Sequence, residues 1–519
     1  MSKKVKYITT AIVYPNNRIH VGFGWECVGA DWLKRTYQLR GVETYFATGM
    51  DEHSLKVQRA AEAKGLDPKV YCDQMANDIQ KVIDDIGVSY DRFIRTSDAD
   101  HHRVVEKLIQ RCFDQGDIYQ AKYEGYYSEV TESFYTEKEL IDGLCPVSKT
   151  KPKWISEENY FFKLSKYEKP LLKWFEENPE FLQPENRKNE VLSFIRQGLK
   201  DFSISRSNFT WGIPLPFDPS HVIYVWFDAL INYLTAAGIE DELRDPKSQA
   251  AETFRKRWSE TIHIIGKDIS RFHCIYWPAM LMSMGIDLPK RVFAHGFLNL
   301  KGEKISKSAG NIVTPDDVVK KTGVDPFRYY LLAENDFSSD GNFSYESLAY
   351  KVNADLANDW GNLVNRSLSM ARKYFPEHRF KAPKQFAPAT SVIDSFEKFK
   401  EELVTAHEKI DPMTYVKRCN QRSRELNLFI DQMKPWKMAK DPCQKEDLEK
   451  VLAVILEGIR MIAVGLMSVC PVQLPKVFEQ LGVPRVDFQG GFETLVWGET
   501  EFFPQKPTPL YPRLELEKE

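Results

Sequence analysis

The hydrophobic pattern of this 519-residue chain changes its period part-way along, and that change limits the folds open to it. In the first 300 residues, β-branched and aromatic runs alternate with helical stretches. We expect strands at 5–13, 43–48, 261–265 and 291–297, and helices at 53–65, 69–86 and 270–284. Strands that alternate with helices at this pitch predict an α/β fold built on a doubly wound, Rossmann-like parallel sheet.

The rest of the chain has two other characters. Between residues 117 and 215, prolines and tyrosines interrupt short alternating runs, which indicates an insertion into the sheet domain. After about residue 345 the period is almost purely helical and predicts an all-α bundle, with helices at 346–373, 390–409, 412–433 and 445–470. We therefore expect a split sheet domain at 1–116 and 216–300, an insertion at 117–215, a lysine-rich region at 301–345 and a helical domain at 346–519.

Charge and composition exclude several classes of protein. The formal net charge is −3, so nucleic-acid binding would have to come from local basic patches. The N-terminus passes directly into a predicted strand and is not a signal peptide, and charged residues interrupt the most apolar stretch, 451–470. The eight cysteines contain no Cys-x-x-Cys pair, which is typical of a reducing compartment. We expect a cytoplasmic protein without a membrane span.

A short turn after the first predicted strand has the features of a phosphate-binding site. It contains His20 and Gly22 and leads into a predicted helix. Glycine lets a ligand approach the backbone closely, and the N–H groups at a helix N-terminus attract anions. His20 can donate a hydrogen bond to a phosphate oxygen. Taken alone, the turn is explained more simply as a capping loop with a surface histidine.

A second segment, residues 301–311, follows the predicted strand at 291–297 and carries Lys304 and Lys307 among small residues. Such a loop can surround a triphosphate, although a lone lysine-rich loop is more often a solvated surface turn. Both segments follow strands of one predicted sheet, at the carboxyl edge where such sheets bind ligands. Their joint placement favours a nucleotide site.

The two segments resemble the signatures of class I aminoacyl-tRNA synthetases. His20-Val21-Gly22-Phe23 stands in the place of H-I-G-H, and Lys304-Ile305-Ser306-Lys307-Ser308 in that of K-M-S-K-S. The resemblance implies ATP binding, with Mg²⁺ accompanying the nucleotide, and transition-state stabilisation by His20, Lys304 and Lys307. Phe23 departs from the signature, which has a second histidine at this position. Phenylalanine cannot hydrogen-bond a phosphate, so one expected donor is missing. The resemblance further implies that ATP contacts Gly22, Phe23, Glu26, Gly266, Asp268, Ile305, Ser306 and Ser308.

Further stretches resemble the methionine-specific members of this class. They are T-A-I-V-Y-P at 10–15, T-G-M-D-E-H at 48–53, V-W-F-D-A-L-I-N-Y at 225–233 and G-K-D-I-S-R-F-H at 266–273. Asp51, at a predicted strand end, can neutralise the ammonium of methionine. Each aromatic residue alone is explained more simply by core packing, but as a set they suit a polarisable thioether. The implied methionine pocket consists of Ile12, Tyr14, Trp226, Ala229, Tyr233, Ile269 and Phe272, with His273 against the sulfur.

The insertion lacks two features of related enzymes. It is too short for the hydrolytic editing domain of the leucine, isoleucine and valine enzymes. Those enzymes need editing because amino acids that differ by one methylene bind a pocket with similar affinity. Family relatives often carry zinc knuckles in this region, but this chain keeps only Cys145 there. One thiolate cannot build a tetrahedral site, so we predict no structural zinc and no protein-bound metal.

Two stretches of the helical region, 358–366 and 434–437, resemble the anticodon-reading elements of the family. Asn362 and Arg366 are four residues apart and share one helix face, and Trp436 offers a stacking surface. A solvated helix face and a packing tryptophan are the simpler readings of these residues. The whole resemblance implies an enzyme that activates L-methionine with ATP and charges tRNA(Met), without a protein general base.

Two other functions remain open. Another class I enzyme, such as the cysteine-specific synthetase, would need zinc ligands in its pocket, and the sequence lacks them. A catalytically idle, synthetase-like tRNA-binding protein is favoured only by Phe23, and the intact lysine segment argues against it. The chain ends without the extra tRNA-binding module that some relatives use to dimerise, so we expect a monomer.

Overall fold

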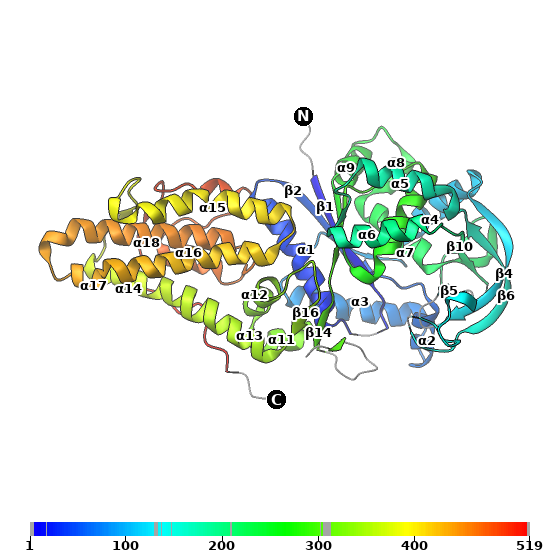
Figure 1. The fold of residues 1–519 in the computed structure, drawn as a ribbon, viewed down its shortest axis with the longest axis horizontal. Helices are drawn as coiled ribbons and strands as arrows, with labels where there is room; N and C mark the ends of the chain where they lie inside the picture. Colours follow the sequence, from blue (N-terminus) through cyan, green and yellow to red (C-terminus); the bar gives the residue numbers. More distant parts are fainter. Residues whose placement is uncertain are drawn as a thin grey trace.

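The computed structural model describes residues 5–16, 18–128, 133–135, 137–146, 148–207, 210–300, 303–304 and 313–515. The molecule is elongated, with a helical bundle at one end and a mixed α/β region at the other (Figure 1). Among the described residues, none of the helices combines the length and the apolar character that a membrane crossing requires.

A six-stranded parallel sheet forms the centre of the α/β region. Its strand order is β3-β2-β1-β12-β13-β7, and every neighbouring pair is parallel. The strand order reverses direction on either side of β1, which creates the crevice where sheets of this kind bind ligands. The doubly wound parallel fold is thereby confirmed. Its strands are β1 (Val5–Val13), β2 (Glu43–Met50), β3 (Arg92–Arg95), β7 (Leu182–Gln183), β12 (Thr261–Gly266) and β13 (Arg291–His295).

Helices cover both faces of this sheet. Alternate side chains of a strand point to opposite faces, so Ile8 joins one buried hydrophobic cluster and Tyr7 the other. The predicted helices at 53–65 and 69–86 are present as α2 and α3. The helices of this region are α1 (Val21–Leu39), α2 (Leu55–Glu62), α3 (Pro68–Asp85), α4 (Ala99–Asp114), α7 (Val225–Ala237), α8 (Ile239–Arg244), α9 (Gln249–Trp258) and α10 (Trp277–Met284).

The segment between α4 and α7 builds two small antiparallel sheets and two helices. One sheet has the order β5-β4-β6-β8 and the other β10-β11-β9. The segment also supplies β7, which pairs with β13 at the edge of the central sheet. Its elements are β4 (Ile118–Ser128), β5 (Ser133–Tyr135), β6 (Lys153–Phe162), α5 (Glu168–Glu177), α6 (Glu185–Arg196), β8 (Phe202–Ser203), β9 (Ser205–Arg206), β10 (Pro214–Leu215) and β11 (Asp218–Ile223).

A small three-stranded sheet connects the central sheet to the bundle. It consists of β14 (Leu298–Leu300), β15 (Glu303–Lys304) and β16 (Gly341–Phe343). Between residue 313 and β16, the chain forms α11 (Pro315–Thr322) and α12 (Val324–Glu334).

The bundle helices match the predicted ranges closely, with one difference. The predicted helix at 346–373 contains a π-helical stretch, Asn353–Gly361, in its middle. Hydrophobic periodicity does not reveal this widening, which inserts a residue into a helical turn. The elements are α13 (Tyr345–Val352), α14 (Asn362–Tyr374), α15 (Thr390–Glu408), α16 (Pro412–Met433), α17 (Pro435–Met438), α18 (Lys445–Leu466), α19 (Leu474–Leu481), and the paired strands β17 (Phe380–Lys381) and β18 (Glu501–Phe502).

Helix α1 belongs to the packing of both halves. Its Trp32 ring lies edge-on to His407 of α15 and to Tyr415 of α16, at centroid distances of 5.5 and 5.4 Å. Its Asp31 accepts a 2.6 Å hydrogen bond from Arg328 of α12, and both side chains are fully buried. The helix therefore runs from the carboxyl edge of the sheet into the base of the bundle.

Candidate active site

Helix α1 begins at the carboxyl edge of the sheet with His20 as its N-cap residue. The Nδ1 atom of His20 accepts a 3.1 Å hydrogen bond from the Gly22 N–H. A Cβ atom on Gly22 would lie 2.9 Å from the His20 ring, so a larger residue here would displace the ring from this position. Because Nδ1 accepts, Nε2 carries the proton of the neutral ring and can donate to an anion at the helix N-terminus.

Phe23, the residue that departs from the family signature, is packed into the protein. Its side chain is 9% exposed and joins the hydrophobic cluster beneath α1. On the next residue, Gly24, a Cβ atom would come within 2.9 Å of Pro315 Cγ. The first turn of α1 therefore uses Phe23 for packing and leaves polar contacts to His20 and the backbone.

Residues that precede and follow the lysine segment, Leu298 and Val313, lie near this first turn. Lys304 pairs through its backbone with Asn299 of β14, and the carbonyl of Leu298 lies 4.0 Å from the Cβ position at Gly22. On the other side, Val313 O accepts a 2.9 Å hydrogen bond from Val21 N–H. The backbone thus brings the two signatures together. The Lys304 side chain and the predicted residues Ile305, Ser306, Lys307 and Ser308 lie outside the described residues.

The loop after β12 holds the next two predicted ATP contacts. A Cβ on Gly266 would lie 2.8 Å from Asp268 Oδ1, so the glycine leaves room for this carboxylate. Between them, Lys267 Nζ forms a 2.7 Å ion pair with Asp340 and lies 4.6 Å from the Phe297 ring. These contacts fix the loop against the region that leads into β14 and β16.

Glu26 lies deeper in the protein, where its side chain connects α1 to the strands β1 and β13. One carboxylate oxygen accepts a 2.7 Å hydrogen bond from Ala11 N–H of β1, and the other lies 2.8 Å from His295 Nε2 of β13. The side chain is buried. Within the protein, Glu26 aligns β1, α1 and β13, and its predicted contact with adenosine remains a prediction.

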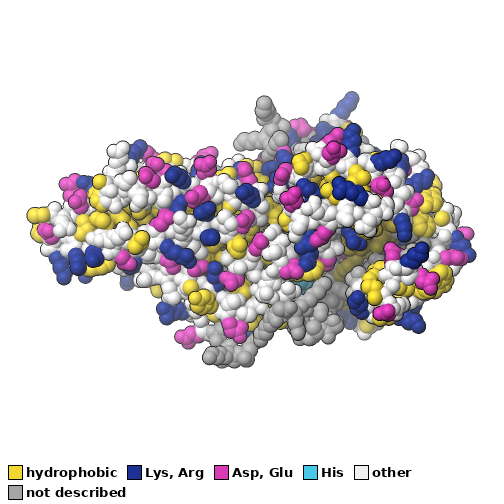
Figure 2. Space-filling view, viewed as in Figure 1, with side chains coloured by type: hydrophobic (Ala, Val, Ile, Leu, Met, Phe, Trp, Pro, Cys, Tyr) yellow, Lys and Arg dark blue, Asp and Glu magenta, His cyan; other side chains and the backbone are white. Residues whose placement is uncertain are grey.

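Four residues of the predicted methionine pocket form two contacting pairs between α7 and the segment before α10. The rings of Trp226 and Phe272 stack in parallel, with centroids 3.8 Å apart. Ala229 is buried, and Ile12, Tyr14 and Ile269 are partly buried. Figure 2 shows a hollow with apolar side chains on its walls in the α/β half of the molecule.

Tyr233 and His273 form a hydrogen-bonded pair with one defined polarity. His273 Nδ1 lies 3.1 Å from the Ile269 carbonyl, which can only accept, so Nδ1 carries the proton. Its Nε2 therefore accepts from the Tyr233 hydroxyl at 2.7 Å. Burial lowers the pKa of His273 to about 4, which keeps the ring neutral at physiological pH. The pair is therefore ordered and uncharged.

Asp51 follows the last residue of β2 and is buried, with its N–H bonded to Val13 O at 2.8 Å. Two residues later, His53 Nδ1 lies 2.7 Å from Asp228 of α7, and His101 Nε2 of α4 lies 2.8 Å from the other Asp228 oxygen. Burial alone would raise the pKa of Asp228, but the two facing imidazoles hold it well below its usual range. One buried carboxylate thus fixes the Asp51 loop to the helix that carries Trp226.

The predicted anticodon residues lie at different depths in the bundle. Asn362 is exposed and lines a 530 Å³ hollow together with Asn358 and Arg513. Arg366 is partly buried and donates a 2.6 Å hydrogen bond to Asn427 of α16. Trp436, in α17, is 41% exposed. Basic side chains gather near α17 at the far end of the bundle (Figure 2).

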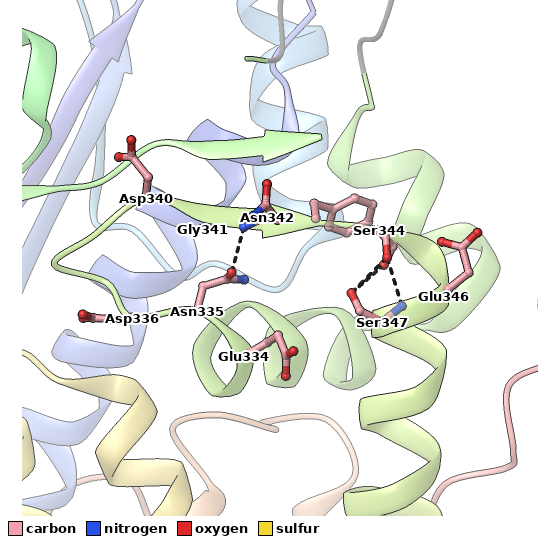
Figure 3. A pocket seen from close by; sticks show the side chains of 10 residues that line it. Glu334, Asn335, Asp336, Asp340, Gly341, Asn342, Ser344, Glu346 and Ser347 are labelled. Carbon is pink, nitrogen blue, oxygen red and sulfur yellow. Dashed lines mark hydrogen bonds between the residues drawn. The ribbon is translucent and has the colours of Figure 1, made fainter. Parts of the chain in front are cut away.

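A separate groove of 660 Å³ runs along β16 and the start of α13 (Figure 3). Its floor contains Asn335, whose Oδ1 accepts a 2.9 Å hydrogen bond from Asn342 N–H. No predicted ATP or methionine residue is among the side chains that line it, and four of those side chains are acidic. The acidic residues are Glu334, Asp336, Asp340 and Glu346.

Within the described part of the chain, His, Cys, Asp and Glu side chains form no group of three that could hold a metal ion. Cys145 is buried, and its sulfur accepts a 3.4 Å hydrogen bond from Ser148 N–H. The prediction that the insertion lacks zinc remains a prediction. All eight cysteines are described, and no two of them form a disulfide.

Known proteins of one enzyme family are similar to this chain over its whole length. The family model described as "tRNA synthetases class I (M)" matches residues 6–153 and 137–368. The methionine–tRNA ligase of Caldanaerobacter subterraneus is 42% identical over 100% of this chain and 80% of its own length. That of Bacillus subtilis is 42% identical over 99% of this chain and 78% of its own. The chain belongs to the class I methionyl-tRNA synthetases.

Solved structures of this synthetase family show the same architecture. Mycobacterium tuberculosis methionyl-tRNA synthetase in complex with methionyl-adenylate superposes with a TM-score of 0.93, at 39% identity, over 98% of this chain and 100% of that one. The free-state crystal structure of the same enzyme gives a TM-score of 0.85, at 37% identity, over 99% of both chains. The present structure is thus more similar to the adenylate-bound form.

Two features of this synthetase site were not predicted from the sequence. Asp228, His53 and His101 form the buried link behind Asp51, although two of these residues fall within the methionine-family stretches. Arg206 of β9 is also buried, with its guanidinium 4.4 Å above the ring of Tyr224, which caps α7. The sequence around Arg206 has no periodic pattern, so only the fold shows that it lies beside the pocket helix.

Proposed function

We propose that this enzyme activates L-methionine with ATP to give methionyl-adenylate and pyrophosphate, and then transfers methionine to the 3′ end of tRNA(Met). The observation that carries this proposal is the convergence of four chain segments at one edge of the central sheet. They are the His20 turn, the two ends of the lysine segment, the loop after β12, and the Asp51 loop with its neighbouring pocket.

In the first step, an oxygen of the methionine carboxylate attacks the α-phosphorus of ATP, and the bond to the β,γ-pyrophosphate breaks in line with it. We assign Asp51 to the substrate ammonium and the stacked Trp226–Phe272 pair to the side chain. We assign His20 Nε2, whose proton is not used by the hydrogen bond to Gly22, to the position where negative charge develops. The lysines Lys304 and Lys307 are proposed to share that task.

ATP enters as its Mg²⁺ complex, and the metal neutralises phosphate charge while it is bound to the nucleotide. In the second step, a terminal hydroxyl of the tRNA attacks the adenylate carbonyl and AMP leaves. The proton of that hydroxyl has an acceptor in the departing phosphate, so the proposal needs no dedicated protein base. We further propose that Asn362, Arg366 and Trp436 read the anticodon, and that the enzyme works in the cytoplasm as a monomer.

The test is amino-acid-dependent ATP–pyrophosphate exchange measured with each of the twenty amino acids. We expect exchange with methionine to exceed that with every other amino acid. Exchange that depends on cysteine instead would support the neighbouring class I enzyme. A complete lack of exchange, combined with tRNA binding, would support a catalytically idle tRNA-binding protein and would overturn the proposal.

A further inference from the structure

Arg18 lies two residues before His20, and its side chain contacts residues that follow the lysine segment in sequence. Its Nη2 atom donates hydrogen bonds to both carboxylate oxygens of Asp316, at 3.1 and 2.8 Å, and its Nη1 atom lies 3.7 Å from Asp317. The Arg18 side chain is mostly exposed, but Asp316 is only 7% exposed. This ion pair therefore joins a surface side chain to a carboxylate that is fixed in the fold.

Residues 313–316 also contact the first turn of α1 at two other positions. Val313 O is bonded to Val21 N–H at 2.9 Å, and the Pro315 ring occupies the space beside Gly24. Residues 313–316 come shortly after the lysine segment and include the first two residues of α11. We call residues 313–316 the return limb. The return limb lies along the His20 turn, and Arg18 binds its last residue, Asp316.

We propose that Arg18 is a positioning residue for adenylate formation, because it holds the return limb against the turn that carries His20. This inference rests on the proposed function. Lys304 is paired to β14 at one end of the lysine segment, and Val313 is bonded to α1 at the other. Arg18 therefore fixes residues 313–316 relative to the turn that carries His20.

Arg18 does not act as a catalytic group in this proposal, since its guanidinium is bonded to Asp316. An ionised Asp316 is required, and burial by itself would raise its pKa. The neighbouring Lys320, Thr314 and Arg18 outweigh burial and lower the pKa of Asp316 below its ordinary value. The carboxylate is therefore charged at neutral pH, and the pair persists under assay conditions.

The chain offers a matched control in Lys320. Its Nζ lies 3.0 Å from the same Asp316 carboxylate, but Lys320 and Asp316 are four residues apart on α11. Lys320→Ala therefore removes a cation from Asp316 without separating the return limb from the His20 turn. A purely electrostatic or stabilising role of Asp316 would make the Arg18 and Lys320 variants alike. A positioning role makes them different.

The experiment measures methionine-dependent ATP–pyrophosphate exchange with the full-length chain and the variants Arg18→Ala, Lys320→Ala, Asp316→Asn and Arg18→Ala/Asp316→Asn. Because an exposed ion pair contributes little, we expect Arg18→Ala to lower kcat by about three- to tenfold. The KM for methionine should change by less than about twofold, since its pocket lies on other elements. The kcat of Lys320→Ala should stay within about twofold of wild type. The melting temperatures of Arg18→Ala and Lys320→Ala should agree with that of wild type, as for most exposed sites.

Three results would overturn the inference. The first is wild-type kcat in Arg18→Ala, and the second is an equal loss in Lys320→Ala. The third is that Arg18→Ala lowers kcat by the same factor when Asp316→Asn is already present, because the two changes should not add if the pair acts as one unit. High salt should also narrow the gap between wild type and Arg18→Ala. If the wild-type chain shows no methionine-dependent exchange, the proposed function fails instead.

Discussion

Replacing Asp228 by asparagine tests how the two halves of the proposed methionine pocket are held together. Asp228 accepts one hydrogen bond from His53 and one from His101, and it lies on α7 between Trp226 and Ala229. Asparagine keeps one acceptor oxygen and turns an NH₂ group toward the second imidazole, which also donates. The variant loses one charge-assisted hydrogen bond in a fully buried site, which costs about 1.5–3 kcal/mol.

If this free energy is needed to hold Asp51 in place relative to α7, kcat/KM for methionine decreases by about 10- to 150-fold. The KM for ATP should change by less than about threefold, because the His20 turn and the loop after β12 do not contact Asp228. Methionine and ATP titrations of pyrophosphate exchange, each with the other substrate saturating, separate the two effects.

Asp325→Asn is the matched control. Asp325 is equally buried and accepts hydrogen bonds from Val472 N–H at 3.0 Å and Gln473 N–H at 2.7 Å, but it lies in α12 near the bundle. We expect it to lower the melting temperature without changing the KM for methionine. The reasoning is refuted if Asp228→Asn keeps kcat/KM for methionine within about twofold of wild type, or if Asp325→Asn reduces it equally.

The other predictions concern single residues. Phe23→His should change the rate of the ATP step by less than about tenfold in exchange assays, because the His20 turn already supplies donors; a much larger gain would show that the second donor is needed. Trp436→Ala should reduce tRNA charging far more than pyrophosphate exchange, and equal losses would mean that Trp436 is structural. The pKa of His273 is about 4 in the folded protein, below that of an unfolded histidine, so its neutral form stabilises the fold fully above about pH 6.5 and progressively less as pH falls toward 4. His273→Gln should flatten this part of the pH dependence in thermal melts. Metal analysis of the purified protein should find no stoichiometric zinc, and tightly bound zinc would contradict the Cys145 argument.

The periodic parts of the fold were predictable from the sequence. The strands β1, β2, β12 and β13 and the long bundle helices follow side-chain patterns that depend only on which face is buried. Two features did not follow this rule. The two-residue strand β7 is too short to show a period and is recognised only by its pairing with β13. The π-helical stretch Asn353–Gly361 keeps a helical hydrophobic pattern while changing the backbone hydrogen bonds.

The site was predictable where a residue type and its position in a motif both point to chemistry, as for His20. It was not predictable where the chemistry depends on a partner distant in sequence. The pairing of Asp228 with His101 links residues 127 positions apart, and that of Arg18 with Asp316 links residues 298 apart. No local pattern encodes such a distance. Residue identity shows that a charge exists, and only the fold shows which partner it has.

The way α1 is packed has a consequence for how this protein can be divided or changed by evolution. Cutting the chain before the bundle would leave Trp32, now covered by α15 and α16, as an apolar patch in water, and would leave Arg40 without its Glu408 partner. Another bundle can therefore be transplanted onto this α/β half only if its base presents a matching face to α1. The two halves are inherited together.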